Sequence, residues 1–148
     1  MAEYTLKPME AVVGKQSFEM LVKDGVCLFE DFENNVEALY KGEVASLYAL
    51  MNDVANLKSL PVTKFHPYNK GDAAVREFEF KTKHLRAYAI EKPGGKIVII
   101  GGTKANQKKD EATFRKYKNQ YVESLKSNYY DTRKTTQVSR ILDYTHPE

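Results

Sequence analysis

The chain has 148 residues, of which 42% are hydrophobic and 29% are charged, as in a folded domain with a core. No apolar run approaches the ~18 residues that cross a bilayer, and the N-terminus lacks the apolar stretch of a signal peptide. Cys27 is the single cysteine, so no disulfide framework or thiolate metal cluster is expected. We therefore expect a cytoplasmic protein that does not contact a membrane.

Charge is distributed unevenly along the chain. The net charge of +3 combines −5 over residues 1–63 with +8 over residues 64–148, and residues 76–118 hold 12 basic and 5 acidic side chains. A basic face of this kind would attract a polyanion such as nucleic acid, or an acidic protein segment. A solvated surface with surplus lysine is the simpler alternative.

The first half of the chain predicts a strand followed by two helices. Residues 18–22 favour a strand, which ends at the Asp24-Gly25 turn. Apolar residues then recur at helical spacing from Phe29 to Tyr40, and Gly42 is expected to end this helix. A second helix is predicted from about Glu43 to a point before residue 60. The two helices would form an antiparallel hairpin whose apolar stripes belong to the core.

The second half predicts a loop over residues 63–74, three strands and a helix. The strands are expected around residues 78–80, 85–90 and 96–100, and their short linkers favour an antiparallel meander. Gly101-Gly102 would end the last strand, and a helix would begin near Asp110 as N-cap. The tail over residues 127–148 has no clear role.

These elements predict a single α+β domain over residues 1–148. An N-terminal helix hairpin would pack on a small twisted antiparallel sheet, followed by a C-terminal helix. The other face of the sheet would be left open, and the basic residues would be available to line it.

Several kinds of chemistry have no support in the sequence. It contains no GxGxxG, Walker, GxSxG or HExxH motif. The three histidines and Cys27 lack metal-ligand spacing, so neither a metal nor another cofactor is expected. Glu77 and Glu79 share one face of a strand, and we interpret them as solvent-facing partners of nearby lysines.

The remaining candidates are cations, with one histidine and one glutamine among them. Converging cations suit phosphoryl chemistry, since charge gathers on the non-bridging oxygens in the transition state, while interleaved aromatic residues could stack on unpaired bases. This pattern alone does not separate a nucleic-acid binder from a nuclease. The candidate residues are Arg76, Lys81, Lys83, His84, Arg86, Lys104, Gln107, Lys108, Lys109, Arg115, Lys116 and Lys118.

An ordered series of motifs resembles the HigB-like branch of the RelE/ParE toxins of bacterial toxin–antitoxin systems. The series is Lys81 and Lys83, then Leu85-Arg86-Ala87-Tyr88, the apolar strand 96–100 and the loop Lys104-Ala105-Asn106-Gln107-Lys108. The upstream helix pair is also similar, so the resemblance covers about residues 18–126 and leaves out the tail. It implies a RelE-like fold.

The resemblance implies a metal-independent, ribosome-dependent mRNA endonuclease, an mRNA interferase, held inactive by a cognate antitoxin, typically a helix-turn-helix protein. In such enzymes a ribose 2′-hydroxyl attacks the neighbouring phosphorus. Arg86 would clamp the phosphate, so Arg86→Ala would abolish toxicity with the fold intact. Lys104 would neutralise charge at the reacting phosphate, and Lys83 or His84 would act as base or acid. RNA-binding positions are Lys81, Gln107, Lys108, Lys109, Arg115 and Lys118.

Some members of this family have a histidine or tyrosine near the C-terminus as acid or base, which the matched loop of this chain lacks. His84, Tyr88 and Tyr117 are the nearest candidates. A second hypothesis is therefore a protein of the same fold that cleaves nothing, either a ParE-type gyrase inhibitor or a degenerate toxin that still binds its antitoxin. A third is a structural adaptor with a basic face for an acidic protein.

Overall fold

The computed structural model describes residues 2–68 and 75–132, with side chains described as far as residue 126. It has an α+β architecture, as the sequence predicts. Seven strands form one sheet: β1 (Tyr4–Pro8), β2 (Ser17–Lys23), β3 (Val26–Cys27), β4 (Phe65–Tyr68), β5 (Glu77–Lys81), β6 (Leu85–Lys92) and β7 (Gly95–Thr103). The helices are α1 (Leu28–Asn35), α2 (Lys41–Ala55) and α3 (Gln107–Thr132), with the short 3-10 turns η1 (Ala38–Tyr40) and η2 (Lys104–Asn106).

The sheet is mixed, which corrects the expected antiparallel sheet. Its strand order is β1-β2-β7-β6-β5-β4, with β3 paired to β2 alone. The predicted meander of β5, β6 and β7 is antiparallel, but β2 runs parallel to β7, with Phe18 opposite Lys96. This pairing places β2 beside β7, and the long stretch of chain between them, which includes α1 and α2, allows the two strands to run parallel.

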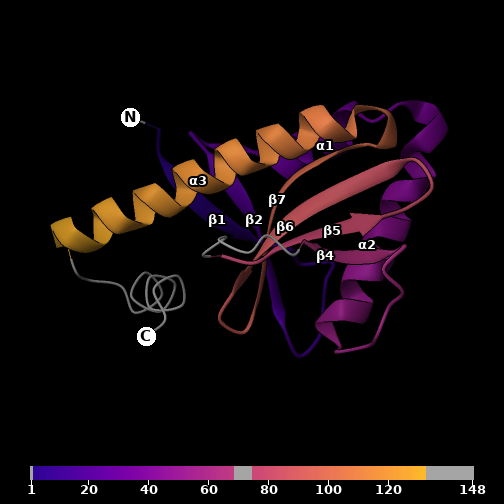
Figure 1. Ribbon diagram of the computed structural model, residues 1–148, viewed down its shortest axis with the longest axis horizontal. Coiled ribbons are helices and arrows are strands. Elements are labelled where there is room, and N and C mark those ends of the chain that lie inside the picture. The colour runs from indigo at the N-terminus through magenta and orange to yellow at the C-terminus, as the bar shows by residue number, and fades with distance from the viewer. Residues whose placement is uncertain (1, 69–74, 133–148) are drawn as a thin grey trace.

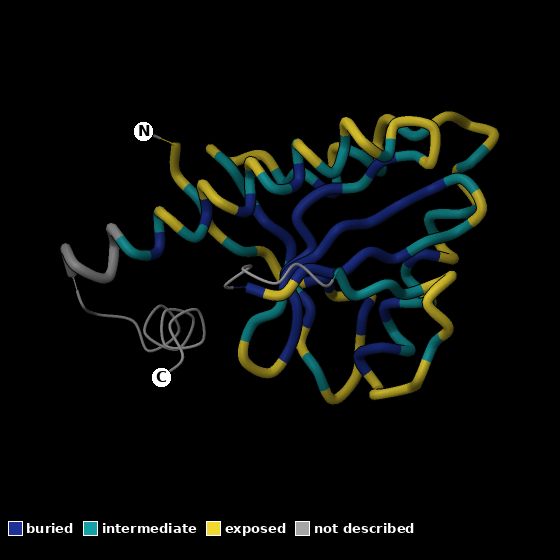
Figure 2. Tube along the Cα trace, viewed as in Figure 1, coloured by how far each residue is buried: buried dark blue, intermediate teal, exposed yellow. Residues whose placement is uncertain are grey.

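Helices cover both faces of the sheet, so the expectation that one face is open and lined by basic residues is wrong. Along β6, Leu85, Ala87 and Ala89 pack toward α1 and α2, whereas Tyr88 and Ile90 pack toward Phe114 and Leu125 of α3. This alternation follows from the two-residue period of a strand. Figure 1 shows α3 along one side of the strands and α2 on the other. In Figure 2 the central strands are the deeply buried part of the chain.

Several local boundaries differ from the predicted ones. The first helix ends at Asn35, and Gly42 lies inside α2 rather than between two helices. The N-terminal segment, which had no predicted role, forms β1, and β4 lies within the predicted loop 63–74. Asp24 and Gly25 adopt positive φ values of 50° and 83°, as the predicted tight turn requires.

The C-terminal helix also begins earlier than predicted. It starts at Gln107, so Asp110 lies inside the first turn, where its carboxylate accepts the Thr103 N–H at 3.2 Å. The tail over residues 133–148 lies outside the described residues. Among the described residues, no helix has the length and apolar character needed to span a membrane.

Candidate active site: a histidine–carboxylate pair beside a lysine-lined groove

The turn between β5 and β6 carries two of the predicted site residues, Lys83 and His84, and follows Lys81 at the end of β5. The turn is fixed by its own hydrogen bonds. The Thr82 N–H donates to the Leu85 carbonyl at 3.0 Å, and the Leu85 N–H donates to Thr82 Oγ1 at 3.1 Å. The Arg86 guanidinium adds bonds to the carbonyls of Thr82 at 2.7 Å and Leu85 at 2.9 Å. The turn is therefore held in one conformation from both its backbone and its side chains.

Glu43, in the first turn of α2, binds this turn through both carboxylate oxygens. Oε1 accepts the His84 N–H at 2.9 Å and the Thr82 hydroxyl at 2.5 Å. Oε2 lies 2.6 Å from His84 Nδ1. A carboxylate at this distance favours the tautomer with hydrogen on Nδ1, which leaves Nε2 as the nitrogen able to accept a proton.

The charge state of Glu43 suits this orienting role. Desolvation alone would raise its pKa, but the hydrogen bonds from Thr82 and His84 outweigh it and lower the pKa from 4.5 to about 2. Glu43 is consequently ionised near neutral pH. An ionised carboxylate both orients an imidazole and stabilises the imidazolium formed when that imidazole takes up a proton.

Two further contacts fix the position of His84. Its ring stacks on Tyr40 with 4.4 Å between ring centroids and an interplanar angle of 22°. Its carbonyl accepts the N–H of Lys104 at 2.9 Å, which brings the end of β7 against the β5–β6 turn. The structure thus places two predicted site residues, His84 and Lys104, beside each other.

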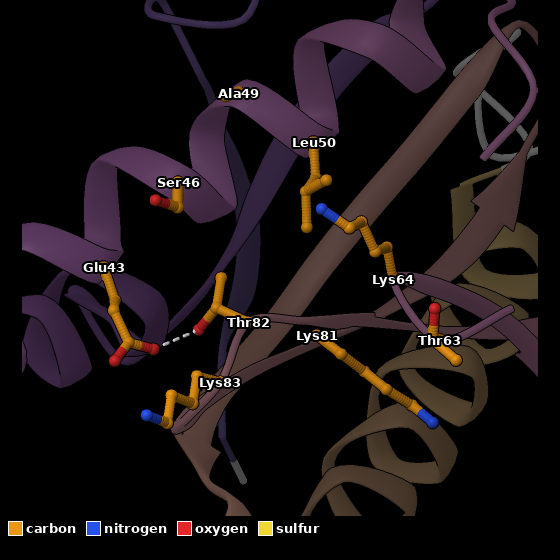
Figure 3. A pocket seen from close by; sticks show the side chains of 9 residues that line it. All are labelled: Glu43, Ser46, Ala49, Leu50, Thr63, Lys64, Lys81, Thr82 and Lys83. Carbon is orange, nitrogen blue, oxygen red and sulfur yellow. Dashed lines mark hydrogen bonds between the residues drawn. The ribbon is translucent and has the colours of Figure 1, made fainter. Parts of the chain in front are cut away.

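A groove of about 680 Å³ begins at Glu43 and runs between α2 and the β5–β6 turn. Three lysines contribute to its lining, and Figure 3 shows Lys83 on the side of Glu43, Lys64 reaching toward Leu50 and Lys81 pointing the other way. Lys81 also forms a 3.7 Å ion pair with Glu79. The groove lining consists of Glu43, Ser46, Ala49, Leu50, Thr63, Lys64, Lys81, Thr82 and Lys83.

Arg86, the predicted phosphate clamp, is buried with 6% of its surface exposed. Its Nε lies 3.6 Å from Glu79 Oε2, and its bonds to Thr82 and Leu85 direct it into the turn. Its strand neighbour on β7 is Gly102. The geometry gives Arg86 a positioning role toward the turn that carries His84.

Arg115 and Lys118 point toward the sheet, away from any open basic surface. Glu77 Oε1 lies 3.0 Å from the Arg115 guanidinium, and Glu77 Oε2 accepts from Lys118 Nζ at 2.7 Å. Lys118 also donates to the Val75 carbonyl at 3.0 Å, and it is only 6% exposed. The expectation that Glu77 and Glu79 face solvent is wrong, since they are 3% and 1% exposed.

The other predicted RNA-binding residues lie at the start of α3. Lys108 and Lys109 are exposed, whereas Gln107 is half-buried and its amide lies 3.4 Å from Glu111. Lys83 and Lys104 are exposed as well. Tyr88, named as an acid or base candidate, is fully buried and stacks on Phe114.

Sequence reasoning missed Glu43, Tyr40, Thr82 and Lys64 as parts of this site. Glu43 is separated from His84 by 41 positions, and no local spacing links the two. The signal that was available is Thr82-x-His84 in a tight turn, since both residue types recruit carboxylates. Comparisons of the chain with protein-family models, with curated proteins and with solved structures found no match.

Proposed function

We propose that the protein is a metal-independent endoribonuclease whose general base is His84. The observation that carries the proposal is the 2.6 Å contact between His84 Nδ1 and an ionised Glu43, beside a groove lined by lysines. The motif series around Lys81, Arg86 and Lys104, which resembles the HigB-like toxins, adds to it.

The proposed reaction is an internal transfer at a ribose. His84 Nε2 takes the proton of a 2′-hydroxyl, whose oxygen attacks the adjacent phosphorus. The bond from phosphorus to O5′ then breaks, which leaves a 2′,3′-cyclic phosphate on one product and a 5′-hydroxyl on the other. O5′ takes a proton from a lysine ammonium, for which Lys83, next to His84, is the candidate.

The lysines supply the electrostatic part of this reaction. Lys83 precedes His84 in the chain, and the backbone N–H of Lys104 donates to the His84 carbonyl, so both lysines lie next to His84. Their charges would stabilise the phosphorane oxygens, which gather negative charge as the bond to the 2′-oxygen forms. Lys64 and Lys81 would hold the flanking phosphates along the groove.

In a cell, we propose that this activity is that of a toxin acting on mRNA at the ribosome, and therefore in the cytoplasm. A cognate antitoxin would hold the protein inactive, as antitoxins do for the toxins that this chain resembles. These partners rest on the resemblance of residues 18–126.

The test compares three variants for cleavage of a single-stranded RNA and of translated mRNA in cells. His84→Gln should abolish cleavage, and Glu43→Gln should reduce it by two or more orders of magnitude. Lys58→Ala, in the loop after α2, should leave cleavage unchanged. Products of the wild type should carry 2′,3′-cyclic phosphates. An active His84→Gln variant of normal stability would overturn the proposal.

A second candidate function is binding without cleavage, in which the same surface binds a nucleic acid or a protein. The observation that favours it is the burial of Arg86, because the arginine expected on the phosphate is bonded to Thr82 and Leu85. Growth arrest by the wild type that persists in His84→Gln, with no cut messages, would establish this candidate.

A further inference from the structure

A smaller cavity of about 240 Å³ adjoins the His84–Glu43 pair, and the proposed reaction does not use it. It lies where α1 ends, where β7 ends and where α3 begins. Its size is below the ~300–1,000 Å³ of pockets for drug-sized ligands, so it suits one planar ring system better than a whole nucleotide. The lining residues are Asp31, Phe32, Asn35, Val36, Glu37, Tyr40, Leu85, Gly102, Thr103, Asn106 and Asp110.

Shared residues connect this cavity to the candidate active site. Tyr40 lines the cavity and also stacks on His84 at 4.4 Å. Leu85 and Thr103 line it too, and their chain neighbours, His84 and Lys104, are joined by a backbone hydrogen bond. A nucleotide whose phosphate sits at His84 would therefore have its base within reach of the cavity.

The lining combines aromatic rings with hydrogen-bond acceptors. Phe32 and Tyr40 supply rings on which a base could stack, and Asp31, Glu37 and Asp110 supply carboxylates. None of the residues described around the cavity is a lysine, arginine or histidine, so it would repel a phosphate. Chelation of a metal is not indicated either, since the described residues hold no group of three metal-ligating side chains.

Asp110 is the best-positioned of these acceptors. Its Oδ2 takes the Thr103 N–H at 3.2 Å and lies where a side chain on Gly102 would be, 2.1 Å from an added Cβ. Glycine at position 102 thus lets the carboxylate approach the strand. Burial raises the pKa of Asp110, although the hydrogen bond from Thr103 and the charge of Lys109 act to lower it. A raised pKa is typical of a buried carboxylate with few donors around it.

We propose that this cavity is a subsite for one unpaired nucleobase of single-stranded RNA and that it prefers guanine. This inference rests on the proposed ribonuclease function, because that function brings RNA to His84. Guanine presents two adjacent donors, N1–H and the N2 amino group, which match one carboxylate in a bidentate pair. Adenine, cytosine and uracil each place an acceptor beside their donor, and that acceptor would face the Asp110 carboxylate.

The experiment titrates the isotope-labelled full chain with GMP, AMP, CMP and UMP and follows its backbone amides by NMR. All four ligands carry the same phosphate, so a difference in affinity between them reports on the base alone. GMP should bind about tenfold more tightly than UMP, the range of one bidentate pair, and should shift the amides of Thr103 and Asn106.

Variants make the assignment specific. Asp110→Asn keeps an oxygen for the Thr103 N–H and should remove the preference for GMP, whereas Glu123→Gln, an exposed site on the same helix, should retain it. Asn106→Trp, at an exposed lining position, should fill the cavity and abolish the amide shifts without touching the core. A GMP preference that survives in both cavity variants would overturn the inference.

The two proposals fail separately in these measurements. Equal affinity for the four nucleotides with intact RNA cleavage would overturn the base subsite alone. Selective GMP binding with no cleavage of any RNA would overturn the ribonuclease function and leave the subsite standing.

Discussion

The Arg86 guanidinium donates a 2.7 Å hydrogen bond to the Thr82 carbonyl, and so ties the body of β6 to the turn that carries His84. Thr82 lies two positions before the candidate base His84 in the chain, and Arg86 lies two positions after it. This bond means that Arg86 stabilises the turn from within the fold, a role that differs from clamping a phosphate.

Arg86→Ala should therefore lower the stability of the fold. It removes the bonds to Thr82 and Leu85 and leaves the Glu79 carboxylate, 1% exposed, without its nearest arginine. Loss of one partner of a buried charge pair costs about 3 kcal/mol in the free energy of unfolding. Urea denaturation measures this, with Lys58→Ala, in an exposed surface pair, as the comparison.

Kinetics would separate the two possible roles of Arg86. A positioning role predicts that Arg86→Lys retains part of the cleavage activity and that His84 Nε2 shows an altered NMR signal in Arg86→Ala. An Arg86→Ala protein of full stability, unchanged at His84 and yet inactive, would instead place Arg86 on the phosphate.

The Glu43–His84 pair should make stability depend on pH in the acid range. Glu43 has a pKa of about 2 in the folded chain and an ordinary value of 4.5, so its carboxylate stabilises the fold above about pH 4.5. That contribution should be lost as the pH falls from 4.5 toward 2. The difference in unfolding free energy between wild type and Glu43→Gln, measured by denaturation at several pH values, should shrink over this window. A difference that is constant from pH 6 to pH 2 would contradict the assignment.

The sequence predicted the main strands and helices well and the surroundings of the cations poorly. Local signals placed these elements. Apolar residues at helical spacing indicated α2, and short apolar runs indicated β2, β6 and β7, whose buried side chains pack on both faces of the sheet. The parallel pairing of β2 with β7 and the burial of Glu77 beneath Arg115 depend on contacts between distant segments. Charge alone did not distinguish Lys83, which is exposed, from Lys118, which is buried in an ion pair.

The lysines around His84 should account for the salt dependence of RNA binding. Each lysine that contacts a phosphate of a single strand adds about 0.7 to the slope of log K against log salt. Lys83→Ala and Lys104→Ala should each reduce the slope by about that amount, because both side chains are exposed beside His84. Lys58→Ala, in the loop after α2 and paired with Asp53, should leave the slope unchanged. Equal slopes in all three variants would place the RNA elsewhere.

Lys118 and Arg115 should affect stability and leave RNA affinity unchanged, because both are held by Glu77 between α3 and the sheet. Glu77→Gln should be the most damaging single change in this group, at about 3 kcal/mol or more, since it leaves two cations facing a neutral amide. Lys118→Met should cost less, because Arg115 still neutralises Glu77 and the methionine fills the same buried space. Thermal and urea unfolding would rank the variants, and the salt slope for RNA should equal that of the wild type. A lowered slope in Lys118→Met would require α3 to lift from the sheet when RNA binds.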